Sequence, residues 1–238
     1  RAIHGALLAA EGKLTEAIAA GEALVKQFPT EPDAAILLGT LYSLQNTPHR
    51  VEAVLKKAVE AHPRDLDLLN SLAMAYMRVS NQAKAEAVFR NILAIEPQVF
   101  DHHLKLALFF DQQRQYDKAE ATLREALRLE PESEQRHLAL ADYLAGRRNV
   151  TASEAALAEA RRALPHAVNI QLALGRLYEM HQQPDKARTT YQDLRDRNQS
   201  KPAGDTAKVK LATLDWVEGK QDVATEQLQE VLRNNPRA

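Results

Sequence analysis

The spacing of the prolines constrains the fold of this chain more than any other feature of its 238 residues. Five of the prolines follow one another at intervals of 34 residues, and they are Pro29, Pro63, Pro97, Pro131 and Pro165. Pro236 lies 71 residues further on, which is two such intervals plus three residues. A fixed period of this length indicates a repeat protein, in which one small structural unit is stacked many times.

Other positions follow the same period once the proline is numbered as position 32 of a 34-residue repeat. Position 8 is always small and holds Gly5, Gly39, Ala73, Ala107, Ala141, Gly175 and Ala212. Position 24 is bulky, with Leu55, Phe89, Leu123, Leu157, Tyr191 and Leu228, and Gly21 is its exception. Position 11 holds Leu8, Tyr42, Tyr76, Phe110, Leu144 and Tyr178, and Asp215 is its exception. The repeat is therefore defined by side-chain size as well as by proline.

These positions predict two helices in each repeat. Positions 4, 7, 8 and 11 share one face of a first helix, and positions 20, 24, 27 and 28 share one face of a second. The small residues at positions 8 and 20 are expected where the two helices cross most closely. The proline ends the second helix and redirects the chain. One such hairpin cannot bury its apolar face alone, so neighbouring repeats must stack to complete the core.

This pattern resembles the tetratricopeptide repeat (TPR) family, and the resemblance covers the whole chain. The resemblance implies an all-α, right-handed superhelical solenoid of about fourteen antiparallel helices. We expect residues 1–238 to form a single array of seven repeats, at 1–31, 32–65, 66–99, 100–133, 134–167, 168–201 and 205–238. Residues 202–204 are an insertion for which we expect a longer turn, beside Gln199 at the proline position of repeat six. Because repeat one begins inside its first helix and no polar capping helix follows repeat seven, we expect the chain to be excised from a longer repeat protein.

The composition excludes several classes of function. The 31 basic and 32 acidic residues give a net charge of −1, whereas nucleic-acid binders carry a basic excess. The chain has no cysteine and therefore no thiolate nucleophile or cysteine-ligated metal. No phosphate-binding loop, dinucleotide fingerprint or metalloprotease motif occurs, and no apolar run is long enough to span a bilayer. We expect a protein that is not an enzyme, needs no cofactor or metal, does not span a membrane and binds a protein or peptide.

Three groups of polar residues allow two interpretations each. His103 and His137 both fall at position 4 and either hold a metal or fill a packing position; packing is favoured, because no carboxylate completes a ligand set. The position 2 residues Asp33, Asp67 and Asp101 form either an acidic ladder or, as we favour, anions at helix N-termini. The pairs at 147–148 and 161–162, all arginine, either contact an acidic partner or, as we favour, are solvated surface.

The resemblance also implies a binding surface. In TPR proteins, positions 2, 5, 6, 9, 12 and 13 of the first helices face the concave groove. From these positions we predict that partner binding involves Ile36, Asn70, Met74, Met77, Leu104, Lys105, Leu108, Asp142, Arg176, Met180 and Trp216. Contiguous apolar surface, methionines and an aromatic anchor are typical of protein-binding sites. Position 5 is never lysine, so the carboxylate clamp of chaperone-binding TPR domains is absent.

The predicted function is a protein–protein interaction scaffold that holds a peptide, helix or domain in its groove. The chain has abundant alanine and no cysteine, and in this composition it resembles TPR arrays of bacterial envelope systems such as exopolysaccharide export. This resemblance favours the envelope or periplasm over the cytoplasm. Two alternatives stay open. The chain could be a spacer or an array that self-associates through exposed ends, or the regulatory segment of an enzyme whose catalytic domain lies outside it.

Overall fold

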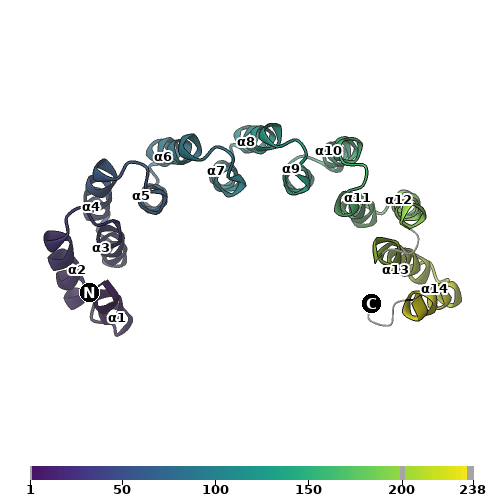
Figure 1. The fold of residues 1–238 in the computed structure, drawn as a ribbon, viewed down its shortest axis with the longest axis horizontal. Coiled ribbons are helices and arrows are strands. Elements are labelled where there is room, and N and C mark those ends of the chain that lie inside the picture. The colour runs from purple at the N-terminus through teal and green to yellow at the C-terminus, as the bar shows by residue number, and fades with distance from the viewer. Residues whose placement is uncertain (1, 199–201, 235–238) are drawn as a thin grey trace. The chain divides into compact units, whose positions relative to one another are not determined.

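The computed structural model describes residues 2–198 and 202–234, and its regular elements in those ranges are fourteen α-helices (Figure 1). By contacts between backbones the chain divides into two compact units, Arg1–Gln115 and Tyr116–Ala238, called here the N-terminal and C-terminal units. The N-terminal unit contains α1 (Ala2–Ala10), α2 (Leu14–Gln27), α3 (Pro32–Leu44), α4 (Pro48–Ala61), α5 (Leu66–Arg78), α6 (Gln82–Ile95) and α7 (Phe100–Gln112). The C-terminal unit contains α8 (Tyr116–Leu129), α9 (Glu134–Arg147), α10 (Val150–Ala163), α11 (Val168–Met180), α12 (Pro184–Arg197), α13 (Pro202–Val217) and α14 (Gln221–Asn234). No described helix is both long and apolar enough to cross a membrane.

The helices pack in chain order within each unit, which is the architecture of an α-solenoid. The second helices end two residues before the recurring proline. The helix α4, for example, ends at Ala61, and His62 leaves the helical conformation with φ −130° and ψ 70° before Pro63. A residue that precedes proline is sterically disfavoured in the α-region. The residue before each of these prolines is therefore non-helical, and the helix ends at the residue before it.

The turn inside each repeat depends on position 15. This residue has a left-handed backbone in six repeats, at Gly12, Asn46, Ser80, Arg114, Gln182 and Gly219, with φ between 55° and 82°. Repeat five differs because α9 continues one residue longer, to Arg147, and Arg148 has φ −113° instead. The first helix of that repeat therefore meets the second through a different turn.

The core lies between the two helices of each hairpin and between neighbouring repeats. The large side chains at position 24, from Leu55 to Tyr191, are buried against the small residues at position 8. Gly21 breaks this pattern for a steric reason. A Cβ at Gly21 would lie 3.2 Å from Leu38 Cδ1 and from Leu41 Cδ1, so leucines of α3 occupy the space that position 24 fills elsewhere.

The expectation of a longer turn at residues 202–204 is wrong. These residues form the first turn of α13, which is 16 residues long. Proline is well suited to the first position of a helix, because its fixed φ is helical and its missing N–H needs no partner there. The insertion thus lengthens a helix. Gln199 lies outside the described residues.

Candidate protein-binding surface

Neighbouring repeats are joined by a recurring cluster of three polar side chains. In repeat three, the Tyr76 hydroxyl donates to Glu52 Oε1 at 3.2 Å, and Lys84 Nζ lies 2.6 Å from the same oxygen. The hydrogen bond from Lys84 holds the pKa of Glu52 below its usual value. The tyrosine and the lysine belong to one repeat and the glutamate to the preceding one, so the cluster ties the two together.

The same cluster recurs in repeat six, where the Tyr178 hydroxyl donates to Glu154 Oε1 at 2.8 Å and Lys186 Nζ lies 3.2 Å away. Burial, together with the bond to Glu154, raises the pKa of Tyr178 to about 12. In repeat seven the charges are exchanged. Asp215 takes the place of the tyrosine, and Arg188 Nη2, at the glutamate position, lies 2.9 Å from Asp215 Oδ1. This ion pair, in which Asp215 is buried and Arg188 is partly exposed, explains why Asp215 departs from the aromatic pattern at position 11.

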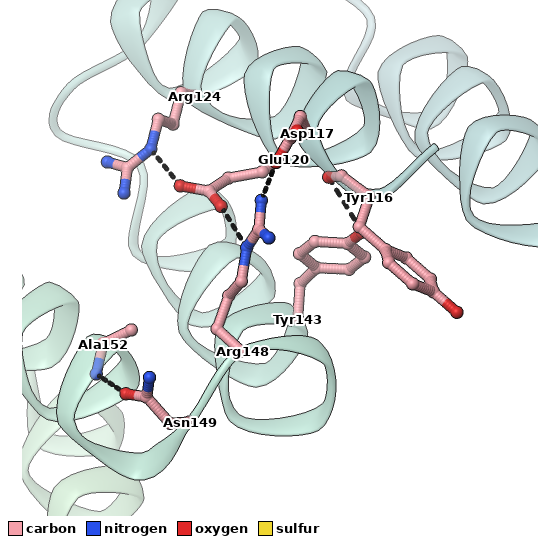
Figure 2. Close-up of polar contacts among 8 residues, drawn as sticks. All are labelled: Tyr116, Asp117, Glu120, Arg124, Tyr143, Arg148, Asn149 and Ala152. Carbon is pink, nitrogen blue, oxygen red and sulfur yellow. Dashed lines mark hydrogen bonds and ion pairs between the residues drawn. The ribbon is translucent and has the colours of Figure 1, made fainter. Parts of the chain in front are cut away.

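Repeats four and five are joined through Arg148 (Figure 2). Its Nε donates to Glu120 Oε2 at 3.0 Å, and its Nη2 pairs with Asp117. Burial alone would raise the pKa of Glu120, but hydrogen bonds from Arg124 and Arg148 hold it below its usual value. The adjacent Arg147 guanidinium lies 5.7 Å from the ring centre of Tyr116. Both arginines are thus engaged within the chain.

The residue after this pair starts the next helix. Asn149 Oδ1 accepts a hydrogen bond from the Ala152 N–H at 2.8 Å and caps α10 (Figure 2). The other basic pair, Arg161 and Arg162, lies in the last turn of α10, where the helix dipole favours cations. The aspartates at position 2 lie in the first turns of α3, α5 and α7, as the interpretation of helix N-terminal anions requires.

The histidines at position 4 support the turns between repeats. His103 Nε2 lies 2.8 Å from the carbonyl oxygen of Pro97, and His137 Nε2 lies 2.8 Å from that of Pro131. Because a carbonyl oxygen only accepts, each Nε2 carries the hydrogen. In repeat six Gln171 donates to Pro165 in the same way, at 3.3 Å. Within the described ranges, no three histidine or acidic side chains are placed to hold a metal ion.

The residues predicted for binding in the N-terminal unit lie on the first helices α3, α5 and α7. Met74 and Leu108 are largely exposed, at 59% and 57%. Lys105 Nζ donates to Asn70 Oδ1 at 3.4 Å, which places α7 beside α5 at this level. Met74 and Leu108 each follow one helical turn later, so they extend the same surface.

A cleft of about 620 Å³ opens between α3 and α5, with α4 below it. It is lined by Ile36, Gly39, Thr40, Ser43, Val51, Leu55, Asn70, Ser71, Met74, Ala75, Met77 and Arg78. Four of the predicted residues line this cleft, namely Ile36, Asn70, Met74 and Met77, while Leu104, Lys105 and Leu108 do not. Val51 and Leu55, which form its floor, were not predicted because they belong to a second helix.

In the C-terminal unit, Asp142, Arg176, Met180 and Trp216 are exposed residues of α9, α11 and α13. A second cleft, of about 540 Å³, lies in this unit along α10, α11 and α12. None of these four side chains lines it; its polar residues include Glu154, Arg161 and Lys186. In the N-terminal unit the structure therefore gathers part of the predicted surface around a cleft, whereas this second cleft involves none of the predicted residues.

The fold and its junctions define a helical repeat protein of the solenoid class. The tetratricopeptide repeat family model matches residues 70–134 and 138–205, more than half of the chain. The chain belongs to the tetratricopeptide repeat family. Proteins of this family are in general non-catalytic scaffolds that bind other proteins. No curated protein matches the sequence.

Solved structures share the fold. A tetratricopeptide repeat protein from Parabacteroides merdae is 16% identical with a TM-score of 0.50, and the match covers 98% of this chain and 91% of that one. The structure of Naa15/Naa10 bound to HypK-THB is 17% identical with a TM-score of 0.56. The match covers all of this chain but 36% of that one. At such identities these likenesses show the fold alone.

Proposed function

We propose that the chain is a protein-interaction scaffold that binds a segment of a partner protein on the first helices of its N-terminal unit. The carrying observation is the apolar surface of Met74 and Leu108 beside the cleft between α3 and α5. Exposed contiguous apolar surface beside a cleft is typical of a binding site. The packing of α3 against α5 and the hydrogen bond from Lys105 of α7 to Asn70 of α5 support this proposal.

The residues predicted in the C-terminal unit belong to the same proposal. Met180 and Trp216 are 72% and 52% exposed, and both side chains are suited to apolar contact with a partner. Asp142 and Arg176 supply charges of both signs. For the setting of the scaffold we propose a bacterial assembly at the cell envelope, with exopolysaccharide export as the leading case. The composition described above supports this setting, and the identity of the captured partner tests it.

The test is a pull-down from source-cell extract with three baits, with the captured proteins identified by mass spectrometry. The first bait is the wild type and the second is Met74→Glu/Leu108→Glu, which places two charges on the proposed surface. The third is the control Val223→Glu/Leu232→Glu, whose side chains are exposed on α14. A partner retained by the wild type and the control but lost by the second bait supports the proposal. Equal capture by all three baits contradicts it.

A second candidate function is self-assembly, and one observation favours it. Leu7 is 55% exposed in α1, although position 10, which it occupies, is buried at Leu41 and Phe109. Leu232 is 54% exposed in α14. Contact between these two faces in successive copies would be head to tail. If the wild type shows a mass in light scattering that rises with concentration, and Val223→Glu/Leu232→Glu abolishes this rise, self-assembly is supported.

A further inference from the structure

The cleft between α3 and α5 lies where one residue departs from the repeat. Position 10 of the first helix is large in six repeats, with Leu7, Leu41, Phe109, Tyr143, Leu177 and Leu214. In repeat three it is Ala75. The large residue covers the second helix of the preceding repeat. Leu41 shows this, because its Cδ1 would lie only 3.2 Å from a Cβ added to Gly21 of α2. Ala75 cannot reach that far, and Val51 and Leu55 of α4 line the cleft instead.

The side chains around this gap keep it open. The α3 wall consists largely of small residues, Gly39, Thr40 and Ser43, and Ser71 stands on α5 beside Ala75. Met74 and Met77 form the other rim, and methionine adapts its shape to an incoming apolar group. A volume of about 620 Å³ lies within the usual range of binding sites and holds several side chains.

The charge of the cleft is one-sided. Arg78 is the one charged residue among those that line it, and none of its described lining residues is acidic. One nitrogen of the Arg78 guanidinium is already bonded, because Nη2 donates to the Ser43 carbonyl oxygen at 2.6 Å. A guanidinium has five N–H donors, so Arg78 keeps donors for a ligand. Lys105, one helix away, adds a second positive charge beside Asn70.

We propose that this cleft binds a partner-protein segment that carries bulky apolar side chains next to an aspartate or glutamate. The apolar side chains fill the space that Ala75 leaves open, above the buried Val51 and Leu55. The carboxylate pairs with Arg78, where bidentate geometry gives a strong charge-assisted bond. This inference rests on the proposed function and adds the chemistry of the recognised segment. A protein segment is favoured as the occupant because the apolar surface continues from the cleft over Met74 to Leu108 on the next helix.

The probe is a library of random 12-residue peptides displayed on phage, selected in parallel against four baits. These are the wild type, Ala75→Leu, Arg78→Glu and the control Ala87→Leu, which makes the same change at an exposed site of α6. Ala75→Leu restores the kind of side chain that most other repeats carry, so it should fill the cleft with equal or higher thermal stability. Peptides with bulky apolar residues beside an acid should be enriched on the wild type and on Ala87→Leu. The best peptide should bind Ala75→Leu and Arg78→Glu about tenfold more weakly or worse by fluorescence anisotropy.

Several results would overturn the proposal. In the first, no peptide is enriched on the wild type. In the second, the same peptides are enriched on Ala75→Leu. In the third, the enriched peptides contain no acidic residue. Arg78→Glu gives an independent answer should Ala75→Leu lose helicity, because Arg78 is exposed and an acidic peptide must then be rejected. The proposed function fails separately. If Met74→Glu/Leu108→Glu loses the partner in the pull-down while Ala75→Leu retains it, the scaffold stands and the cleft is not its recognition site.

Discussion

At the scale of single residues, Gly175 of α11 packs tightly against Tyr191 of α12. Tyr191 is fully buried, and its ring lies against the glycine backbone. A Cβ at Gly175 would overlap Cε1 and Cζ of the ring and lie 2.8 Å from the phenol oxygen. Position 8 is glycine in this repeat because the tyrosine fills the space that an alanine methyl group needs.

We predict that Gly175→Ala lowers the free energy of unfolding by about 1–3 kcal/mol through overpacking. Alanine gains about 1 kcal/mol over glycine in helix propensity, so the clash must outweigh this gain. Urea unfolding followed by circular dichroism measures the difference. The control is Gly39→Ala, where the added Cβ would lie 3.2 Å from Leu55 Cδ2 and a small shift relieves the contact. A Gly175→Ala protein at least as stable as the wild type would show that the ring can move aside.

At the scale of helices and turns, the position 4 side chains hold the chain where one repeat passes to the next. His137 and Gln171 differ in shape, yet each donates to the carbonyl oxygen of the proline six residues earlier. We predict that His137→Gln changes the free energy of unfolding by less than about 1 kcal/mol. His137→Leu should lower it by about 1–3 kcal/mol, because the Pro131 carbonyl then loses its donor. Thermal unfolding of the two variants decides this, and equal losses would mean that imidazole packing, rather than the hydrogen bond, stabilises the turn.

The helices could be predicted from the sequence because their signals are local. Proline at position 32 and small residues at position 8 fix where each helix ends and which face it buries, and the structure confirms the all-α solenoid. The cleft could not be predicted in this way. Ala75 is visible in the sequence as an exception, but the space it leaves depends on α4, which belongs to another repeat. Arg148 likewise acts through Glu120, which lies 28 residues away in the chain. Contacts between repeats depend on how the helices pack. A residue such as Arg148, which the sequence places on the solvated surface, can therefore join two repeats.

At the scale of the whole molecule, the carboxylates in the polar contacts between repeats make the free energy of unfolding depend on pH. Hydrogen bonds from basic or tyrosine partners lower the pKa values of Glu52 and Glu154, and those from two arginines lower that of Glu120. In the unfolded chain a glutamate has a pKa of about 4.3. Their contribution to stability is therefore complete above that pH and is lost as the pH falls through the lower, folded values.

We predict that the melting temperature, followed by circular dichroism, is nearly constant from about pH 7 to pH 5 and falls steeply between about pH 4.5 and pH 3. The control carries Glu52→Gln, Glu120→Gln and Glu154→Gln. It should melt lower than the wild type at pH 7, and its melting temperature should fall less on acidification, because the proton-linked contacts are already gone. Salt should narrow the difference between the two proteins at pH 7, since the pairs are partly exposed and ions screen them. If the melting temperatures of the two proteins fall in parallel as the pH falls, other groups cause the acid sensitivity. Apolar packing alone would then stabilise the contacts between repeats.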